Sequence, residues 1–264
     1  MTAAWPDLAD LPDPNDPQRA QCRALRCVAG EIAPYVLIPG DPLRARRIAS
    51  EWLSDGKLVM VQREFHSYTG TYEGVPVSVV STGIGSPGAA MVVQDLGKLN
   101  CKVAIRVGTA GSCQAEVQPG DNVVATGAVR DEGLSHKFLP LRYPAVPDLT
   151  VTNALCHAAN GKNSPLHAGV VHTSDAFRSP DLDKDIATAQ YAGVLAFEME
   201  ASAVLSIAAI EKLMAGCIFS IDGYVSNVAG GDVVPEAGAR DRGLQDAIST
   251  ALDAIVELEQ SFAV

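Results

Sequence analysis

The chain has 264 residues, of which 47% are hydrophobic and 19% are charged, and this composition is typical of a folded globular protein. Its 20 basic and 31 acidic residues give a formal net charge of −11. A chain this acidic is poorly suited to nucleic acids or anionic membranes, because both attract proteins mainly through Lys and Arg. A small anionic substrate held by a few local arginines stays compatible with this charge.

The ends and the cysteines of the chain predict a reduced, cytoplasmic protein without a metal site. The N-terminus reads MTAAWPDLADLPDPND, with no basic and no apolar segment of the kind that directs secretion, and no apolar run is long enough to cross a membrane. The six cysteines form no C-x-x-C pair and no Cys/His spacing suited to zinc.

The chain order predicts an N-terminal arm and one domain. Residues 1–30 hold four prolines and show no sustained hydrophobic period, which predicts an arm that is either poorly ordered or packed on a neighbouring molecule. Residues 31–264 contain no repeat and no low-complexity tract, and we expect them to form a single domain.

Short apolar runs within this domain predict buried strands. They are Tyr35–Ile38, Val75–Val80, Val103–Val107, Asn122–Val124, Ala168–Val171 and Cys217–Ile221. Helices are predicted from Ser86-Pro87 onward with Ser86 as N-cap, over Glu198–Leu213, and from about Arg242 to Phe262. The alternation of strands and helices predicts an α/β fold in which helices cover both faces of a central sheet.

Three glycine-bearing segments follow predicted strands and are interpreted as turns. They read PGDPLR at residues 39–44, STGIGSP at 81–87 and VGTAG at 107–111. Glycine lets backbone N–H groups approach an anion closely, and a helix that begins after the turn adds its positive end. None of the three matches a Walker loop or G-x-G-x-x-G, which argues against a standard NTPase or dinucleotide site.

Four charged residues, at three places in the sequence, are candidates for a role in binding or catalysis. Arg106 lies within an apolar strand, where a guanidinium needs either an internal carboxylate or a bound phosphate as its partner. Glu198 and Glu200 come at the start of an apolar helix, where they either complement the helix dipole or accept hydrogen bonds from sugar hydroxyls. Asp222 ends a strand and either caps a loop or, with its pKa raised by burial, donates a proton.

Six motifs in a fixed order resemble those of a known family. They are PGDPLR (39–44), REF (63–65), STGIGSP (81–87), RVGTAG (106–111), SDAF (174–177) and EMEAS (198–202). The set resembles the nucleoside phosphorylase family, in the branch that holds uridine phosphorylases and hexameric purine nucleoside phosphorylases. The resemblance runs from about residue 35 to 262 and implies a single-domain, three-layer α/β/α phosphorylase-type fold with a mixed, partly barrel-like central sheet.

The resemblance also implies the site. Phosphate, the co-substrate, is expected to be bound by Gly40, Arg44, Arg106 and Thr109, together with Arg63 from a neighbouring subunit. The ribose is expected to contact Met199 and Glu200, and the base Phe177 and Asp222. Arg106, Glu200 and Asp222 are the expected catalytic residues. No metal or organic cofactor is implied, and an arginine shared between subunits implies a homo-oligomer, either a dimer or a hexamer built from dimers.

The resemblance leaves the base open. Purine-cleaving relatives carry an acid like Asp222, and the Gln-x-Arg pair with which uridine phosphorylases read uracil has no counterpart between Arg178 and Lys184. The segment Leu139–Val146, however, looks more like the uridine branch, and no histidine before His66 is present to contact the sugar 5′ hydroxyl. We favour a purine nucleoside phosphorylase, with a uridine phosphorylase as the alternative. A nucleosidase that uses water and a non-catalytic nucleoside-binding protein are further alternatives, which the complete set of arginines and glutamates disfavours.

Overall fold

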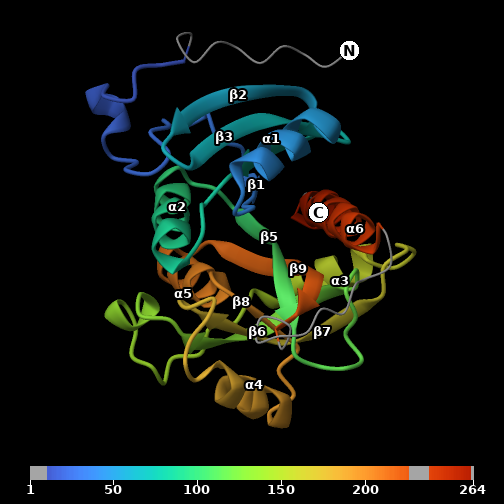
Figure 1. Cartoon of the computed structure of the whole chain (residues 1–264). Coiled ribbons are helices and arrows are strands. Elements are labelled where there is room, and N and C mark those ends of the chain that lie inside the picture. Colours follow the sequence, from blue (N-terminus) through green and yellow to red (C-terminus); the bar gives the residue numbers. More distant parts are fainter. Residues whose placement is uncertain (1–10, 226–237, 263–264) are drawn as a thin grey trace.

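The computed structural model describes residues 11–225 and 238–262, and in this part of the chain nine strands form one sheet (Figure 1). The strands are β1 (Tyr35–Leu37), β2 (Ser54–Gln62), β3 (Phe65–Tyr72), β4 (Val75–Val80), β5 (Val103–Ser112), β6 (Asn122–Asp131), β7 (Leu166–Ser174), β8 (Ala196–Glu198) and β9 (Met214–Tyr224). The helices are α1 (Pro42–Glu51), α2 (Ser86–Lys98), α3 (Leu149–Ala158), α4 (Leu182–Tyr191), α5 (Ala201–Glu211) and α6 (Ala239–Phe262), with short 3-10 turns η2 (Pro17–Arg19) and η3 (Ser135–Lys137). No helix within the described ranges is long and apolar enough to span a membrane.

The sheet is partly open and partly closed. Its strand order is β2-β3-β4-β1-β5-β8-β7-β6-β9, and a further pairing of β5 with β9 closes the last five strands into a ring. The sheet is mixed: pairs such as β1–β5 and β6–β7 are parallel, and pairs such as β3–β4 and β6–β9 are antiparallel. The predicted α/β fold with a mixed, partly barrel-like sheet is therefore confirmed.

Helices cover both faces of the sheet and enclose two apolar cores (Figure 1). On one face α2 packs against α5, and on the other α6 packs against α3 and β9, with α1 over β3 and β4. Neighbouring residues of one strand serve different cores: Val36 lies in the core under α2 and α5, and Leu37 in the core under α6. This is why β1 is apolar at consecutive positions, and why such runs identified strands in the sequence.

All three predicted helix starts are wrong by one to three residues, and α6 begins at Ala239 instead of about Arg242. The N-cap of α2 is Gly85, with φ 96°, because the Ser86 hydroxyl donates to the Met199 carbonyl at 3.1 Å instead of capping its own helix. Glu198 is not helical but ends β8, and α5 begins only at Ala201. The two carboxylates of the E-M-E motif therefore precede the helix.

The third glycine segment is not a turn, in contrast to the prediction. β5 continues through Gly108 and Gly111 because β9 pairs with it along this whole length. A Cβ atom at Gly108 would lie 2.7 Å from the ring of Phe219, and one at Gly111 would lie 2.8 Å from the side chain of Val225. These glycines allow close packing of side chains inside the closed half of the sheet.

The segment before β1 is anchored on α2. The buried Asp95 accepts the backbone N–H groups of Ala24 and Leu25 at 2.7 and 3.1 Å, and Arg19 pairs with Glu31 at 2.7 Å. Of the predicted arm, residues 1–10 lie outside the described residues, whereas the part from Arg19 onward is held against the domain. The domain boundary at residue 30 stays a prediction.

Candidate active site

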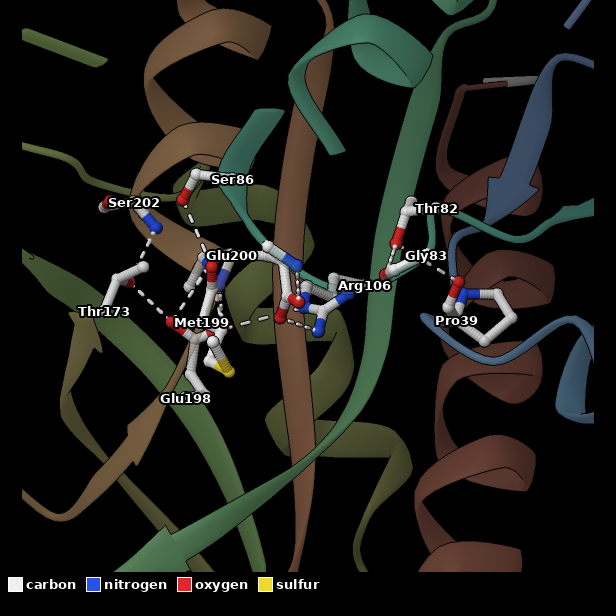
Figure 2. Close-up of polar contacts among 12 residues, drawn as sticks. Pro39, Thr82, Gly83, Ser86, Arg106, Thr173, Glu198, Met199, Glu200 and Ser202 are labelled. Atoms are coloured by element: carbon white, nitrogen blue, oxygen red, sulfur yellow. Dashed lines mark hydrogen bonds and ion pairs between the residues drawn. The ribbon is translucent and has the colours of Figure 1, made fainter. Parts of the chain in front are cut away.

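The site is built around Arg106, which is only 4% exposed and lies in the middle of β5 (Figure 2). Its Nη2 donates to Glu200 Oε2, its Nε lies 3.6 Å from Glu198 Oε2, and its guanidinium carbon lies 5.8 Å from the ring centre of Phe219. The internal carboxylate, one of the two partners considered from the sequence, is thus present. Nη1 has no hydrogen-bond partner among the described residues, so a donor remains for an anion.

Each of the two carboxylates is held at the start of a helix. Glu198 accepts the N–H groups of Glu200 and Ala201 at 2.9 and 2.8 Å, just before α5, whereas Glu200 Oε1 accepts the N–H of Gly85 at 2.6 Å, just before α2. The positive ends of the two helix dipoles favour carboxylates at these points. Burial raises the pKa of Glu198 and the nearby charge of Glu200 raises it as well, while Arg106 acts in the opposite direction.

The first two glycine turns run side by side next to Arg106 (Figure 2). The N–H of Gly83 donates to the carbonyl of Gly40 at 2.9 Å, and the N–H of Thr82 donates to the carbonyl of Pro39 at 3.0 Å. A Cβ atom at Gly40 would lie 3.2 Å from the Gly83 carbonyl oxygen, so the close approach of the two turns favours glycine there. Asp41 caps α1 directly after the first turn, and two helices therefore begin beside the site.

Arg44 interacts electrostatically with Arg106 and Asp222, and Asp222 forms a hydrogen bond with Thr109. Burial lowers the pKa of Arg44 and so does the charge of Arg106, whereas Asp222 opposes this shift. The Asp222 side chain reaches solvent, yet the protein atoms packed around it raise its pKa, against Arg240, a hydrogen bond with Thr109 and the charge of Arg44. Thr109 and Asp222 lie on the paired strands β5 and β9, and the charges of Arg106 and Asp222 reach Arg44 in α1, so these residues belong to one region of the protein.

For three other residues of the predicted site, the structure shows no hydrogen bond or ion pair from their side chains to the site residues described above. Met199 lies between the two glutamates, and its carbonyl accepts the Ser86 hydroxyl (Figure 2). Phe177, after β7, is 66% exposed and stacks on no other described ring. Arg63 lies exposed in the turn between β2 and β3, with φ 55° and no hydrogen bond or ion pair to another described residue. The roles of these three residues stay predictions.

Glu198 was considered from the sequence but given no final role. The E-M-E spacing placed it near Glu200, but only the pairing of β8 with β5 brings it to Arg106. The part of the chain that the structure describes has no group of three or more His, Cys, Asp or Glu side chains arranged for a metal ion. The donors around Arg106 and Arg44 suit an oxyanion instead.

The comparisons with known proteins agree with this geometry. The family model for the phosphorylase superfamily matches residues 34–257. A guanosine phosphorylase of Halorubrum lacusprofundi is 37% identical over 236 residues, which cover 87% of this chain and 95% of the relative. A uridine phosphorylase of Thermococcus kodakarensis is 37% identical over 209 residues, which cover 75% of each chain. The crystal structure of uridine phosphorylase from Vibrio fischeri, complexed with 6-hydroxy-1-naphthoic acid, matches 89% of this chain and 96% of its own, with a TM-score of 0.84 and 28% identity.

The chain therefore belongs to the phosphorylase superfamily. Within it the protein is an enzyme of the nucleoside phosphorylase family, a pentosyltransferase.

Proposed function

We propose that the protein cleaves purine nucleosides with inorganic phosphate and releases the free base and (deoxy)ribose 1-phosphate. The observation that carries this proposal is the grouping of two cations and one acid: Arg106 in β5, Asp222 in the paired strand β9, and Arg44 in the first turn of α1. The charges of Arg106 and Asp222 both act on the pKa of Arg44. Phosphate and a basic leaving group need these two kinds of side chain at the same place.

Phosphate would be held by the arginines and the turn next to them. Arg106 offers Nη1, Arg44 lies beside it, and Gly40 and Thr109 supply the neighbouring backbone and hydroxyl group. A charge-assisted hydrogen bond contributes ~1.5–3 kcal/mol, so a few of them suffice to hold a dianion. One phosphate oxygen then attacks the anomeric carbon as the bond from that carbon to the base nitrogen breaks.

Glu200 and Met199 would contact the ribose. The Glu200 carboxylate is buried and already fixed by Gly85, so it can accept the 2′ and 3′ hydroxyls with little reorganisation. Its negative charge also favours the oxocarbenium-like transition state, in which the sugar ring becomes positive. Both features make it the residue that joins sugar binding to catalysis.

Asp222 would donate a proton to the purine ring as the base leaves, and Phe177 would stack on it. A carboxyl group with a raised pKa holds its proton at a higher pH than an ordinary aspartate, which suits a general acid. The guanosine phosphorylase whose length is covered to 95% supports the purine assignment. Relatives and solved structures named uridine phosphorylase support the alternative, uridine cleavage by the same site.

The proposal extends to assembly and location. Arg106 faces Glu198 and Glu200, and the charges of Asp41 and Asp222 act on Arg44, so carboxylates offset both arginines and a phosphate dianion needs a further cation. Arg63 from a second subunit would supply it, in a cytoplasmic homo-oligomer that is either a dimer or a hexamer built from dimers. No cofactor other than the co-substrate phosphate is needed for this chemistry.

A panel of nucleosides tests the proposal. Inosine, adenosine, guanosine and uridine are incubated with the enzyme, with and without phosphate, and free base and sugar 1-phosphate are quantified. We expect base release that requires phosphate and a higher kcat/KM for at least one purine nucleoside than for uridine. A preference for uridine would replace the purine assignment, base release without phosphate would indicate a nucleosidase, and no release would indicate a binding protein.

A further inference from the structure

A chain of hydrogen bonds leads from Glu198 to Thr173 and Ser202, which lie on the far side of the two glutamates from Arg106 (Figure 2). Thr173, at the end of β7, donates its hydroxyl to Glu198 Oε1 at 2.5 Å and accepts the N–H of Ser202 at 2.9 Å. The Ser202 hydroxyl in turn donates to Glu132 Oε1 at 2.9 Å. These side chains are all buried, at 0–5% exposure, so the hydrogen bonds do not compete with water.

The two glutamates next to Arg106 differ in how many hydrogen bonds their carboxylates accept from the protein. Glu198 receives the Thr173 hydroxyl and the N–H groups of Glu200 and Ala201, so both of its oxygens are committed to protein donors. Glu200 receives only the N–H of Gly85 and the Arg106 guanidinium. Glu200 can therefore still accept hydrogen bonds from a ligand. Glu198 already accepts hydrogen bonds from the protein at both oxygens, and its remaining contact is the ion pair with Arg106 Nε.

We infer that Glu198 is a positioning residue for Arg106 and that the Thr173 hydroxyl sets its place. This inference rests on the proposed function, in which Arg106 binds phosphate. Glu198 Oε2 lies 3.6 Å from Arg106 Nε, which makes an ion pair but no hydrogen bond. A fixed carboxylate on this edge holds the planar guanidinium in one orientation through its charge while Glu200 binds and releases the ribose. The Nη1 donor then stays aligned for phosphate throughout the cycle.

Thr173→Val tests the inference, because valine keeps the shape of threonine and removes its hydroxyl. Glu198 loses one donor, and we expect the KM for phosphate to rise about tenfold while the KM for the nucleoside changes little. Thr173→Ser keeps the hydroxyl and is expected to restore the phosphate KM to within about twofold, which is within the usual effect of a neutral substitution.

Thr152→Val is the matched control. Thr152 is also buried, and its hydroxyl also makes one short hydrogen bond, to the Asp148 carbonyl at 2.8 Å, but it lies in α3 away from Arg106. It should lower the melting temperature without changing the phosphate KM. The melting temperature of every variant is measured with and without inorganic phosphate, so that binding is read separately from turnover.

The outcomes separate the inference from the function on which it rests. If the wild type binds and uses phosphate and Thr173→Val behaves like Thr152→Val, the positioning role is wrong and the proposed function stands. If Thr173→Ser is as impaired as Thr173→Val, the hydroxyl is not the cause and the inference is also wrong. If the wild type neither uses phosphate nor gains stability from it, the proposed function fails and the inference fails with it.

Discussion

Asp222 has two properties that a general acid needs, access to the site and a raised pKa. Its side chain reaches solvent, while burial by the surrounding protein raises its pKa against the opposing effects of Arg240 and Thr109. An exposed aspartate at neutral pH is almost entirely ionised and donates poorly. If Asp222 is the proton donor, as proposed, the cleavage of purine nucleosides depends on the pH at which this carboxyl group loses its proton.

We expect kcat/KM for a purine nucleoside to fall as the pH rises through the pKa of Asp222, because only the protonated carboxyl group can donate. The raised pKa moves this decline above the pH range of an ordinary aspartate. Asp222→Asn should lower kcat/KM for purine cleavage about 10²- to 10⁴-fold and remove the decline. Uridine cleavage by the same variant serves as the control, and an unchanged pH profile for purines would assign the proton to another group.

At the scale of elements, the close contact of β5 with β9 sets where Arg106 lies. Gly108 faces the ring of Phe219, which in turn lies under the Arg106 guanidinium. A Cβ atom at Gly108 would lie 2.7 Å from this ring and 3.4 Å from Arg106 Nη2, so a side chain there would displace the ring. The shape of the site thus depends on the lack of a side chain two residues away.

Gly108→Ala is expected to lower the free energy of unfolding by about 1–3 kcal/mol, because its Cβ would lie 2.7 Å from a ring that cannot move freely. The value is measured by urea denaturation. Gly127→Ala in β6 is the matched control, since its Cβ would meet nothing closer than the Ala145 carbonyl at 3.6 Å. Equal stability of the two variants would show that the barrel relaxes around Gly108.

The elements differ in how well the sequence predicted them, and burial explains the difference. Five of the six predicted strands were found because apolar residues occupy consecutive positions where both faces are covered, whereas β7 was found from its apolar residues although Ala168 and Val170 are exposed. β2 and β3 were missed. β2 opens with SDGK, in which Ser54, Asp55 and Lys57 are exposed, and is apolar only over residues 58–61, whereas β3 reads FHSYTGTY and has no continuous apolar run. β8 has three residues and is a strand only because β5 and β7 pair with it.

The site shows the same limit. Arg106 stood out because an arginine in an apolar strand needs a partner, and the motifs pointed to Glu200. Thr173 and Ser202 carried no such signal, since a buried hydroxyl resembles any small polar residue in a sequence. The third glycine segment was taken for a turn because nothing local reveals that Phe219 and Val225 occupy the space beside it.

At the scale of the whole molecule, the net charge of −11 contrasts with the proposed dianionic substrate. The charge of Arg106 is offset by Glu198 and Glu200, and that of Arg44 by Asp41 and Asp222, so one subunit alone offers phosphate donors but no net positive charge at the site. This balance gives Arg63 its proposed importance. It is exposed and has no described partner in its own chain.

Arg63→Ala should raise the KM for phosphate about tenfold, the effect of losing one charge-assisted contact, and leave the melting temperature unchanged. Steady-state kinetics at varied phosphate provide the measurement, with Arg23→Ala, which removes another exposed arginine, as the control. Mixing Arg63→Ala with Arg106→Ala subunits extends the test. Recovery of activity in the mixture would mean that one subunit completes the site of another, and its absence would confine Arg63 to its own subunit.

The position of β5 also bears on how this scaffold can change its substrate. It is the seam of the sheet: Gly40 and Arg44 come after β1 on its open side, whereas Phe177 follows β7 and Asp222 lies near the end of β9, both strands of the closed ring. The residues proposed for phosphate and those proposed for the base thus come mostly from different halves of the sheet and meet at β5, where Asp222 bonds Thr109. We expect substitutions around Phe177 to alter base preference with little effect on the phosphate half, in a scaffold whose relatives are named for both guanosine and uridine.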